Sequence, residues 1–163
     1  MAVSTNDLKE VSLFRDLPEG MLEKLASIAE RRLYQEGDLV YRKGESSDAF
    51  YALRSGKVLL QKEVSPFATI SFASIKPGYV FEWSGLFRGS LHESNARCCG
   101  PCDVLAIGTA GFLQLLEEDH RMGHWVLKGI AKILQERLDY RTNQLLKVLG
   151  QHPDLERLVP AEE

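Results

Sequence analysis

The stretch GDLVYRKGESSDAFYALRSGKVLLQ, residues 37–61, decides the fold of this chain. It contains two short apolar runs, at residues 39–41 and 50–53, and most of a third at 57–62, and turns that contain glycine separate them. Ser55 and Gly56 stand between the second and third runs, where glycine supplies the positive φ that a tight hairpin requires. Short strands at this spacing indicate an all-β barrel or sandwich core.

The same pattern continues toward the C-terminus, with strand-like runs at residues 68–72, 95–99 and 104–107. Ala68, Ile70 and Phe72 alternate with polar residues, which is typical of a strand with one buried face. We therefore expect the β core to cover residues 32–107.

Helices are predicted on both sides of this core. Residues 6–31 contain a weak helix and then a better one, which Pro18 opens and whose apolar side chains recur at three- and four-residue steps. Thr109 and Asp119 can cap a short helix and a long one, and Gly150 ends the latter. The prediction is one α+β domain over residues 1–163, with C-terminal helices at 109–149 and a tail at 150–163.

The long C-terminal helix carries two apolar stripes. One has the spacing of a heptad seam interrupted by Arg141, and its apolar members include Leu127, Ala131, Leu134, Leu138 and Leu145. A helix packed on one barrel needs a single stripe, so we expect this seam to form a homodimer interface. The alternative is one wide stripe that is buried within a single chain.

Composition and charge argue against several classes of protein. The formal net charge is −3 and the basic residues are dispersed, which disfavours a nucleic-acid partner. No N-terminal signal pattern is evident, and no stretch approaches the roughly 20 apolar residues of a membrane span. Cys98, Cys99 and Cys102 make a poor disulfide framework, so a reducing cytoplasm is expected.

Four motifs in this order resemble the cyclic-nucleotide-binding domains of the catabolite-activator type. They are LFRDLPEGMLEKLA at 13–26, the stretch at 37–61, PGYVFEWSGLF at 77–87 and ARCCGPCDVLAI at 96–107. The resemblance implies an antiparallel β-roll, a double-stranded β-helix similar to a jelly roll, that holds a cyclic nucleotide such as cAMP or cGMP. We expect a stand-alone version without a DNA-binding domain.

The resemblance also implies where the ligand would bind. In that family a short helix in the phosphate-binding cassette directs backbone N–H groups at the cyclic phosphate. A glutamate near the start of the cassette binds the ribose 2′-hydroxyl, and an arginine near its end pairs with the phosphate. Here the usual Phe-Gly-Glu reads Phe81-Glu82-Trp83, which puts Trp83 at the glutamate position. The arginine position falls on His92 or Glu93.

Both polar anchors of the family are therefore altered in this chain. Arg88 and Arg97 are further candidates to reach the ligand. The expected ligand-binding residues are Phe81, Glu82, Trp83, Ser84, Gly85, Leu86, Arg88, His92 and Arg97.

No catalytic motif is evident, so we predict a non-enzymatic regulatory domain that binds a small ligand. One alternative is a degenerate β-roll that serves only dimerisation or protein interaction. Another is a thiol redox protein that uses Cys99 and Cys102, although their Cys-Gly-Pro-Cys motif lies between two predicted strands and not at a helix N-terminus. His120 and His124 lack a third metal ligand, so neither a metal nor another resident cofactor is expected.

Overall fold

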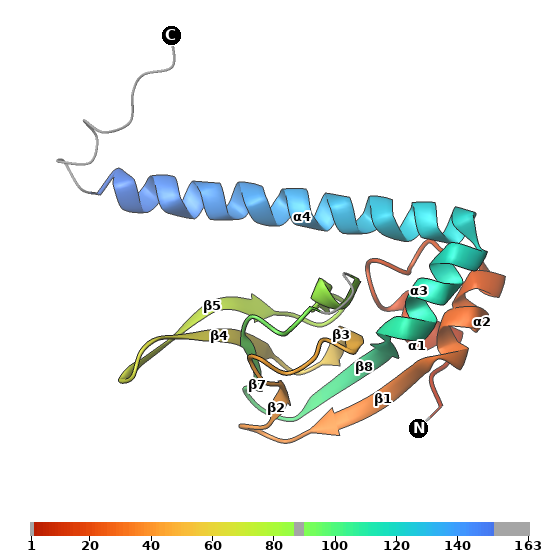
Figure 1. Ribbon diagram of the computed structural model, residues 1–163, viewed down its shortest axis with the longest axis horizontal. Helices are drawn as coiled ribbons and strands as arrows, with labels where there is room; N and C mark the ends of the chain where they lie inside the picture. The colour runs from red at the N-terminus through yellow and green to blue at the C-terminus, as the bar shows by residue number, and fades with distance from the viewer. Residues whose placement is uncertain (1, 87–89, 152–163) are drawn as a thin grey trace, which may run out of the picture. The chain divides into compact units, whose positions relative to one another are not determined.

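The computed structural model describes residues 2–86 and 90–151. The chain divides into two compact units, residues 1–126 and 127–163. The first unit contains the β-roll with its flanking helices, and the second contains most of the last helix (Figure 1).

The β-roll consists of two antiparallel four-stranded sheets. The first has the order β1 (Ala29–Tyr34), β8 (Cys102–Gly108), β3 (Ala49–Ser55) and β6 (Val80–Phe81). The second has the order β2 (Leu39–Tyr41), β7 (Asn95–Cys98), β4 (Val58–Ser65) and β5 (Ala68–Ile75). The chain passes repeatedly from one sheet to the other, which confirms the predicted antiparallel β-roll.

Among the described residues, two helices precede the strands, two follow them, and one 3₁₀ turn lies between β6 and β7. They are α1 (Thr5–Lys9), α2 (Glu19–Ser27), η1 (Ser84–Leu86), α3 (Thr109–Glu118) and α4 (His120–Leu149). No helix in the described part of the chain is long and apolar enough to cross a membrane.

Gly56 makes the hairpin between β3 and β4 possible. Its φ is +94°, and a Cβ atom there would lie 2.5 Å from the Pro101 carbonyl oxygen and 2.7 Å from Cys102 Sγ. Contacts this short are not tolerated, so a side chain at this position would separate the β3–β4 hairpin from the turn between β7 and β8. This confirms the turn that Ser55 and Gly56 predict.

Two apolar clusters hold the first unit together. Side chains from both sheets fill the roll, among them Tyr41, Tyr51, Leu60, Phe81 and Val104. A second cluster joins the N-terminal segment to β3 and α3 through the rings of Phe14, Phe50 and Phe112, whose centroids lie 5.3–6.4 Å apart. Strand β8 lies between the clusters and is buried along nearly its whole length.

The sequence prediction for residues 6–31 is wrong at its C-terminal end. The second helix stops at Ser27, and residues 29–34 form β1, which pairs with β8 from Ala29↔Ile107 to Tyr34↔Cys102. The helical spacing of the apolar residues reaches Ala29, but hydrogen bonding to a strand 70 or so residues away determines the structure from Ala29 onward. The two-residue strand β6 also escaped prediction because it is too short to show a pattern.

The alternation of residues 68–72 predicts the strand β5 correctly but not its burial. Ile70 is 52% exposed and Ala68 is also exposed, whereas Phe72 packs partly on the core. β5 is an edge strand, and the β4–β5 hairpin extends beyond the rest of its sheet (Figure 1). Its tip therefore has no opposite sheet to cover it.

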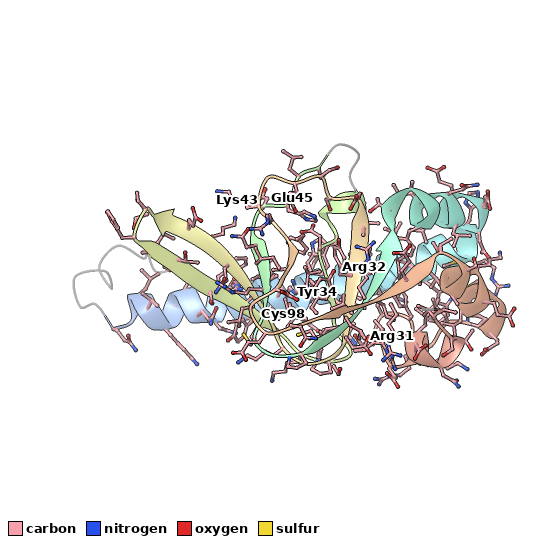
Figure 2. The ribbon with its side chains drawn as sticks, turned by 90° about the horizontal axis from the view of Figure 1, so that it is seen from below. Arg31, Arg32, Tyr34, Lys43, Glu45 and Cys98 are labelled. Atoms are coloured by element: carbon pink, nitrogen blue, oxygen red, sulfur yellow. The ribbon has the colours of Figure 1, made fainter. Side chains whose placement is uncertain are left out.

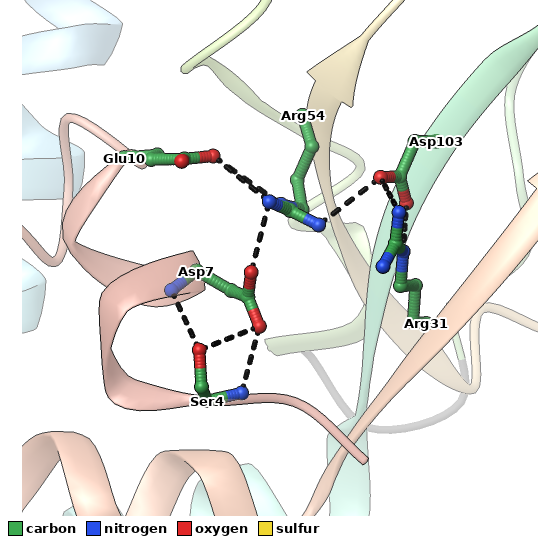
Figure 3. A network of polar contacts seen from close by, with 6 residues as sticks. All are labelled: Ser4, Asp7, Glu10, Arg31, Arg54 and Asp103. Carbon is green, nitrogen blue, oxygen red and sulfur yellow. Dashed lines mark hydrogen bonds and ion pairs between the residues drawn. The ribbon is translucent and has the colours of Figure 1, made fainter. Parts of the chain in front are cut away.

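An ion-pair network ties the N-terminal helix to the first sheet (Figure 3). Arg54 of β3 contacts Asp7 at 2.8 Å, Glu10 at 3.2 Å and Asp103 of β8 at 3.1 Å. Asp103 also pairs with Arg31 at 2.8 Å. Asp7 completes a capping box with Ser4, in which each accepts a hydrogen bond from the backbone N–H of the other.

This environment lowers the pKa of the Asp7 carboxyl. Burial acts to raise the pKa, but the hydrogen bonds from Ser4 and the charges of Arg54 and Arg31 outweigh it. A lowered folded-state pKa stabilises the fold fully above the ordinary value of 3.8, and that stabilisation is lost as the pH falls through the folded-state value.

We therefore expect Asp7→Asn to flatten the acid limb of the stability profile. Between about pH 5 and pH 2, the free energy of unfolding should fall less steeply in this variant than in the wild type, as measured by urea denaturation. Asp16→Asn, at an exposed position, is the matched control and should retain the wild-type slope. If the unfolding free energies of the wild type and Asp7→Asn fall equally steeply with pH, the proposed contribution of Asp7 to the network is contradicted.

Candidate functional site

Glu82 follows directly after β6 and has an unusual backbone conformation. Its φ is +60°, the one positive φ among the described residues other than glycine. A side chain in this left-handed region costs about 1–3 kcal/mol, and the surrounding structure must compensate for it. The resembled family has glycine at this position. Glutamate here thus occupies a backbone site suited to glycine.

The Glu82 carboxylate lies inside the protein and contacts two polar groups. Its side chain is 8% exposed, and Oε2 lies 2.9 Å from Nδ1 of His92. Ser47 Oγ donates a hydrogen bond of 3.4 Å to Oε1. Glu82, one residue before the family's glutamate position, thus places a carboxylate among buried side chains.

His92 is held firmly in place. Its backbone N–H donates to Glu45 O at 2.9 Å, and its carbonyl oxygen accepts from Gly44 N at 2.8 Å. Its ring stacks on Tyr41 with a centroid distance of 3.9 Å and an interplanar angle of 14°. Because its side chain is only 2% exposed, the imidazole faces the interior of the protein.

The contact between His92 and Glu82 has the distance of an ion pair but not the direction of a hydrogen bond. Among the described residues, Nδ1 of His92 has no hydrogen-bond partner, although the carboxylate oxygen lies 2.9 Å away. The pair is a full ion pair only when the imidazole is protonated. A buried ring nitrogen thus keeps an unused capacity to hydrogen-bond.

Two tyrosine hydroxyls complete this interior. Burial raises the pKa of Tyr41 far above its ordinary value, the Glu82 charge adds to the rise, and a hydrogen bond with Ser94 opposes it. Burial raises the pKa of Tyr51 to about 12, against the charge of Arg32. Arg31 and Arg32 project from opposite sides of β1, so Arg31 joins the outer network while Arg32 reaches Tyr51 (Figure 2). Both hydroxyls therefore keep their protons at neutral pH.

The short turn η1 packs closely against two other segments. A Cβ atom on Gly85 would lie 2.7 Å from Thr109 Oγ1 and 2.8 Å from the Ser47 carbonyl oxygen. The absence of a side chain at Gly85 therefore lets the cassette touch both the β2–β3 loop and the first residue of α3. A cavity of about 430 Å³ opens beside this contact, lined by Ser46, Asp48, Leu113 and Gln114 among others.

The structure brings together some of the residues expected to bind ligand and separates others. Glu82 and His92 are in contact, and the Phe81 ring stacks on Tyr51 with centroids 5.6 Å apart. Trp83 and Leu86 are partly buried, Gly85 is buried, and Ser84 begins η1. Arg88 lies outside the described residues.

Arg97 does not reach into the roll as expected. It is exposed, whereas its neighbours on β7, Ala96 and Cys98, belong to the buried core. Strand alternation thus turns Arg97 to the outer face of the second sheet. There it lines a separate hollow of about 490 Å³ together with Asp38 and Gln61.

Sequence reasoning did not find Tyr41, Ser47 or Ser94. A register shift between Leu39 and Tyr41 buries both Val40 and Tyr41, so simple alternation does not predict which way Tyr41 faces. Ser47 and Ser94 belong to loops or strand flanks, where serine is common and gives no signal of burial. Both are nevertheless less than a tenth exposed.

The Cys99–Cys102 motif lies between two strands and not at a helix N-terminus, the position at which a thiol pKa is lowered. It forms the turn between β7 and β8, where Cys99 is exposed and Cys102 is buried with its S–H donating to Lys57 O at 3.4 Å. Burial and a hydrogen bond with Cys102 raise the pKa of the Cys98 thiol to about 12. Since the thiolate is the reactive form, the buried thiol Cys98 is poorly suited to exchange chemistry.

Solved structures share this fold. A cyclic nucleotide-binding domain from Methylobacillus flagellatus aligns with a TM-score of 0.75 and 17% identity, covering 88% of this chain and 80% of that one. The catabolite activator protein of Thermus thermophilus aligns with a TM-score of 0.68 and 25% identity, covering 85% of this chain and 62% of that protein.

Sequence relatives include much longer proteins. An uncharacterized NTE family protein of Mycobacterium tuberculosis is 24% identical over 143 residues, which are 88% of this chain but only 24% of that protein. Residues 31–119, more than half of the chain, match the family described as "Cyclic nucleotide-binding domain". This match spans the β-roll, the cassette and α3. The chain therefore belongs to the cyclic nucleotide-binding domain family.

Proposed function

We propose that this chain is a non-catalytic regulatory domain that binds a small ligand in its β-roll, beside Glu82 and His92. The observation that carries the proposal is the buried contact of 2.9 Å between these two side chains. A buried ion pair can often be replaced by apolar side chains with no loss of stability. A roll that served only as a scaffold would have no need of it, so the polar interior supports a ligand site.

A cyclic nucleotide is the first ligand class to test, and we expect the altered anchors to weaken its binding. Trp83 stands at the position of the glutamate that would bind a ribose hydroxyl, and His92 or Glu93 stands at the position of the arginine that would pair with the phosphate. Losing one partner of a buried charge pair costs about 2–5 kcal/mol. This corresponds to a roughly 30- to several-thousand-fold loss of affinity.

A variant that restores the family pattern tests this proposal. Glu82→Gly, Trp83→Glu and His92→Arg combined should bind cAMP or cGMP at least about 30-fold more tightly than the wild type in calorimetric titrations, because both polar anchors return. Trp83→Glu alone is the control and should recover only part of the gain.

Two outcomes of that titration would contradict the proposal. If the folded, restored variant binds no nucleotide, the roll has no usable cavity and an interaction module is the better account. If the wild type binds as tightly as the restored variant, the altered anchors do not govern affinity.

We also propose that the domain forms a homodimer through the seam on α4. Leu134, Leu138 and Leu145 are 44%, 66% and 58% exposed in the single chain, and Leu127 is exposed as well, while Ala131 occupies the small position between them. Leucines repeated at heptad spacing on an exposed face are typical of a helix that pairs with a second copy. A small ligand could act on a partner by changing the population of the paired state.

Leu134→Lys should abolish the dimer, because it places a charge in the middle of the apolar seam. Light scattering should then give the mass of one 18.3 kDa chain in place of roughly twice that mass. Glu136→Lys is the matched control, since it introduces the same side chain at an exposed position off the seam and should leave the dimer intact. A monomeric wild type would contradict this proposal while leaving ligand binding open.

A further inference from the structure

We infer that the Glu82 carboxylate is an internal anion that fills an oxyanion site formed by Ser47, Tyr41 and His92, and that it excludes free oxyanions from this site. This inference rests on the proposed function, because it names the ligand class that the site selects against. It follows from three features of the described residues: the donors, their burial and the backbone at Glu82.

Three side chains that can donate a hydrogen bond lie near the Glu82 carboxylate. Ser47 Oγ donates to Oε1 at 3.4 Å, and His92 Nδ1 lies 2.9 Å from Oε2. The Tyr41 hydroxyl also interacts with Glu82, and it keeps its proton at neutral pH because burial and the Glu82 charge raise its pKa. Hydroxyl and imidazole donors that converge on one position are the groups that bind a small oxyanion.

The donors are also withdrawn from water. Ser47 is 7% exposed, Tyr41 is 4% exposed and His92 is 3% exposed. An anion in such a place interacts more strongly with its donors than it would at the surface, because the surroundings screen it less. Two anions cannot share the position, since like charges placed side by side strongly disfavour binding.

The internal anion is not ideally bound, so an external one can compete with the same donors once it is removed. Glu82 reaches them only from a backbone with a φ of +60°, which disfavours any side chain. His92 Nδ1 has no in-line hydrogen-bond partner among the described residues. A single substitution to glycine at position 82 would remove the backbone strain and leave the donors without the carboxylate.

The test uses inorganic phosphate as the probe and the full chain as the protein. Glu82→Gly should bind phosphate about tenfold more tightly than the wild type or better, measured by calorimetry and by phosphate-dependent shifts of the His92 imidazole resonances in NMR spectra. Glu82→Gln keeps a side chain but removes the charge, so it should show a smaller gain. Thermal unfolding checks that each variant is folded.

Two controls make the gain specific. Glu93→Gln removes a negative charge from the next residue after His92, at an exposed position paired with Lys62, and should leave phosphate binding unchanged. Glu82→Gly combined with His92→Phe retains an aromatic ring for Tyr41 to stack on and should lose the gain.

The inference is overturned if folded Glu82→Gly and Glu82→Gln bind phosphate no better than the wild type, or if Glu93→Gln gains as much. These results are independent of the nucleotide titrations. If Glu82→Gly binds phosphate more tightly but the restored variant binds no nucleotide, only the proposed function is contradicted. If the restored variant binds nucleotide but Glu82→Gly binds phosphate no more tightly than the wild type, only the internal-anion inference is contradicted.

Discussion

The carboxylate of Glu82 and the imidazole of His92 meet inside the β-roll, and the geometry of the candidate site depends on that contact. It requires a left-handed backbone directly after β6 and a histidine anchored by the backbone of Gly44 and Glu45. It also requires a tyrosine ring stacked on the imidazole to exclude water. A buried charge without such partners would destabilise the fold by several kcal/mol. The burial of the Glu82 carboxylate therefore depends on all of these features.

The same constraint explains how a family fold can carry an altered site. The cyclic nucleotide-binding domain provides a roll, a cassette after β6 and a helix after β8, and this chain keeps all three. Gly85 still allows η1 to touch Ser47 and Thr109, which connects the polar interior to the start of α3. The charges of the site are different, because the carboxylate of Glu82 lies next to the buried polar groups of His92 and Ser47. The fold of the family is retained, while the charged side chains of the candidate site differ from the family pattern.

Glycines and alternating apolar residues made most of the strands and turns predictable from the sequence. The pairing of distant strands and the direction of individual side chains were not predictable in this way. Gly56 marks a hairpin because its φ and its close neighbours leave no alternative, and that signal is local. Residues 29–31 are predicted as helix, because only the pairing of β1 with β8 makes them a strand. The sequence places Glu82 one residue from the family's glutamate position, but the positive φ that brings its carboxylate to His92 appears only in three dimensions. Arg97 lies on the outer face of the second sheet because strand alternation turns it away from the core, a direction that the motif alone does not give.

The most direct test of this account is the coupling energy between Glu82 and His92. A double-mutant cycle with Glu82→Gln and His92→Gln, each variant followed by urea unfolding, isolates their interaction from the effects of either change alone. The account predicts a favourable coupling within the range of about 0.5–3 kcal/mol found for residues in contact. Additive effects, with a coupling below about 0.5 kcal/mol, would show that the two side chains do not hold each other and would contradict the account.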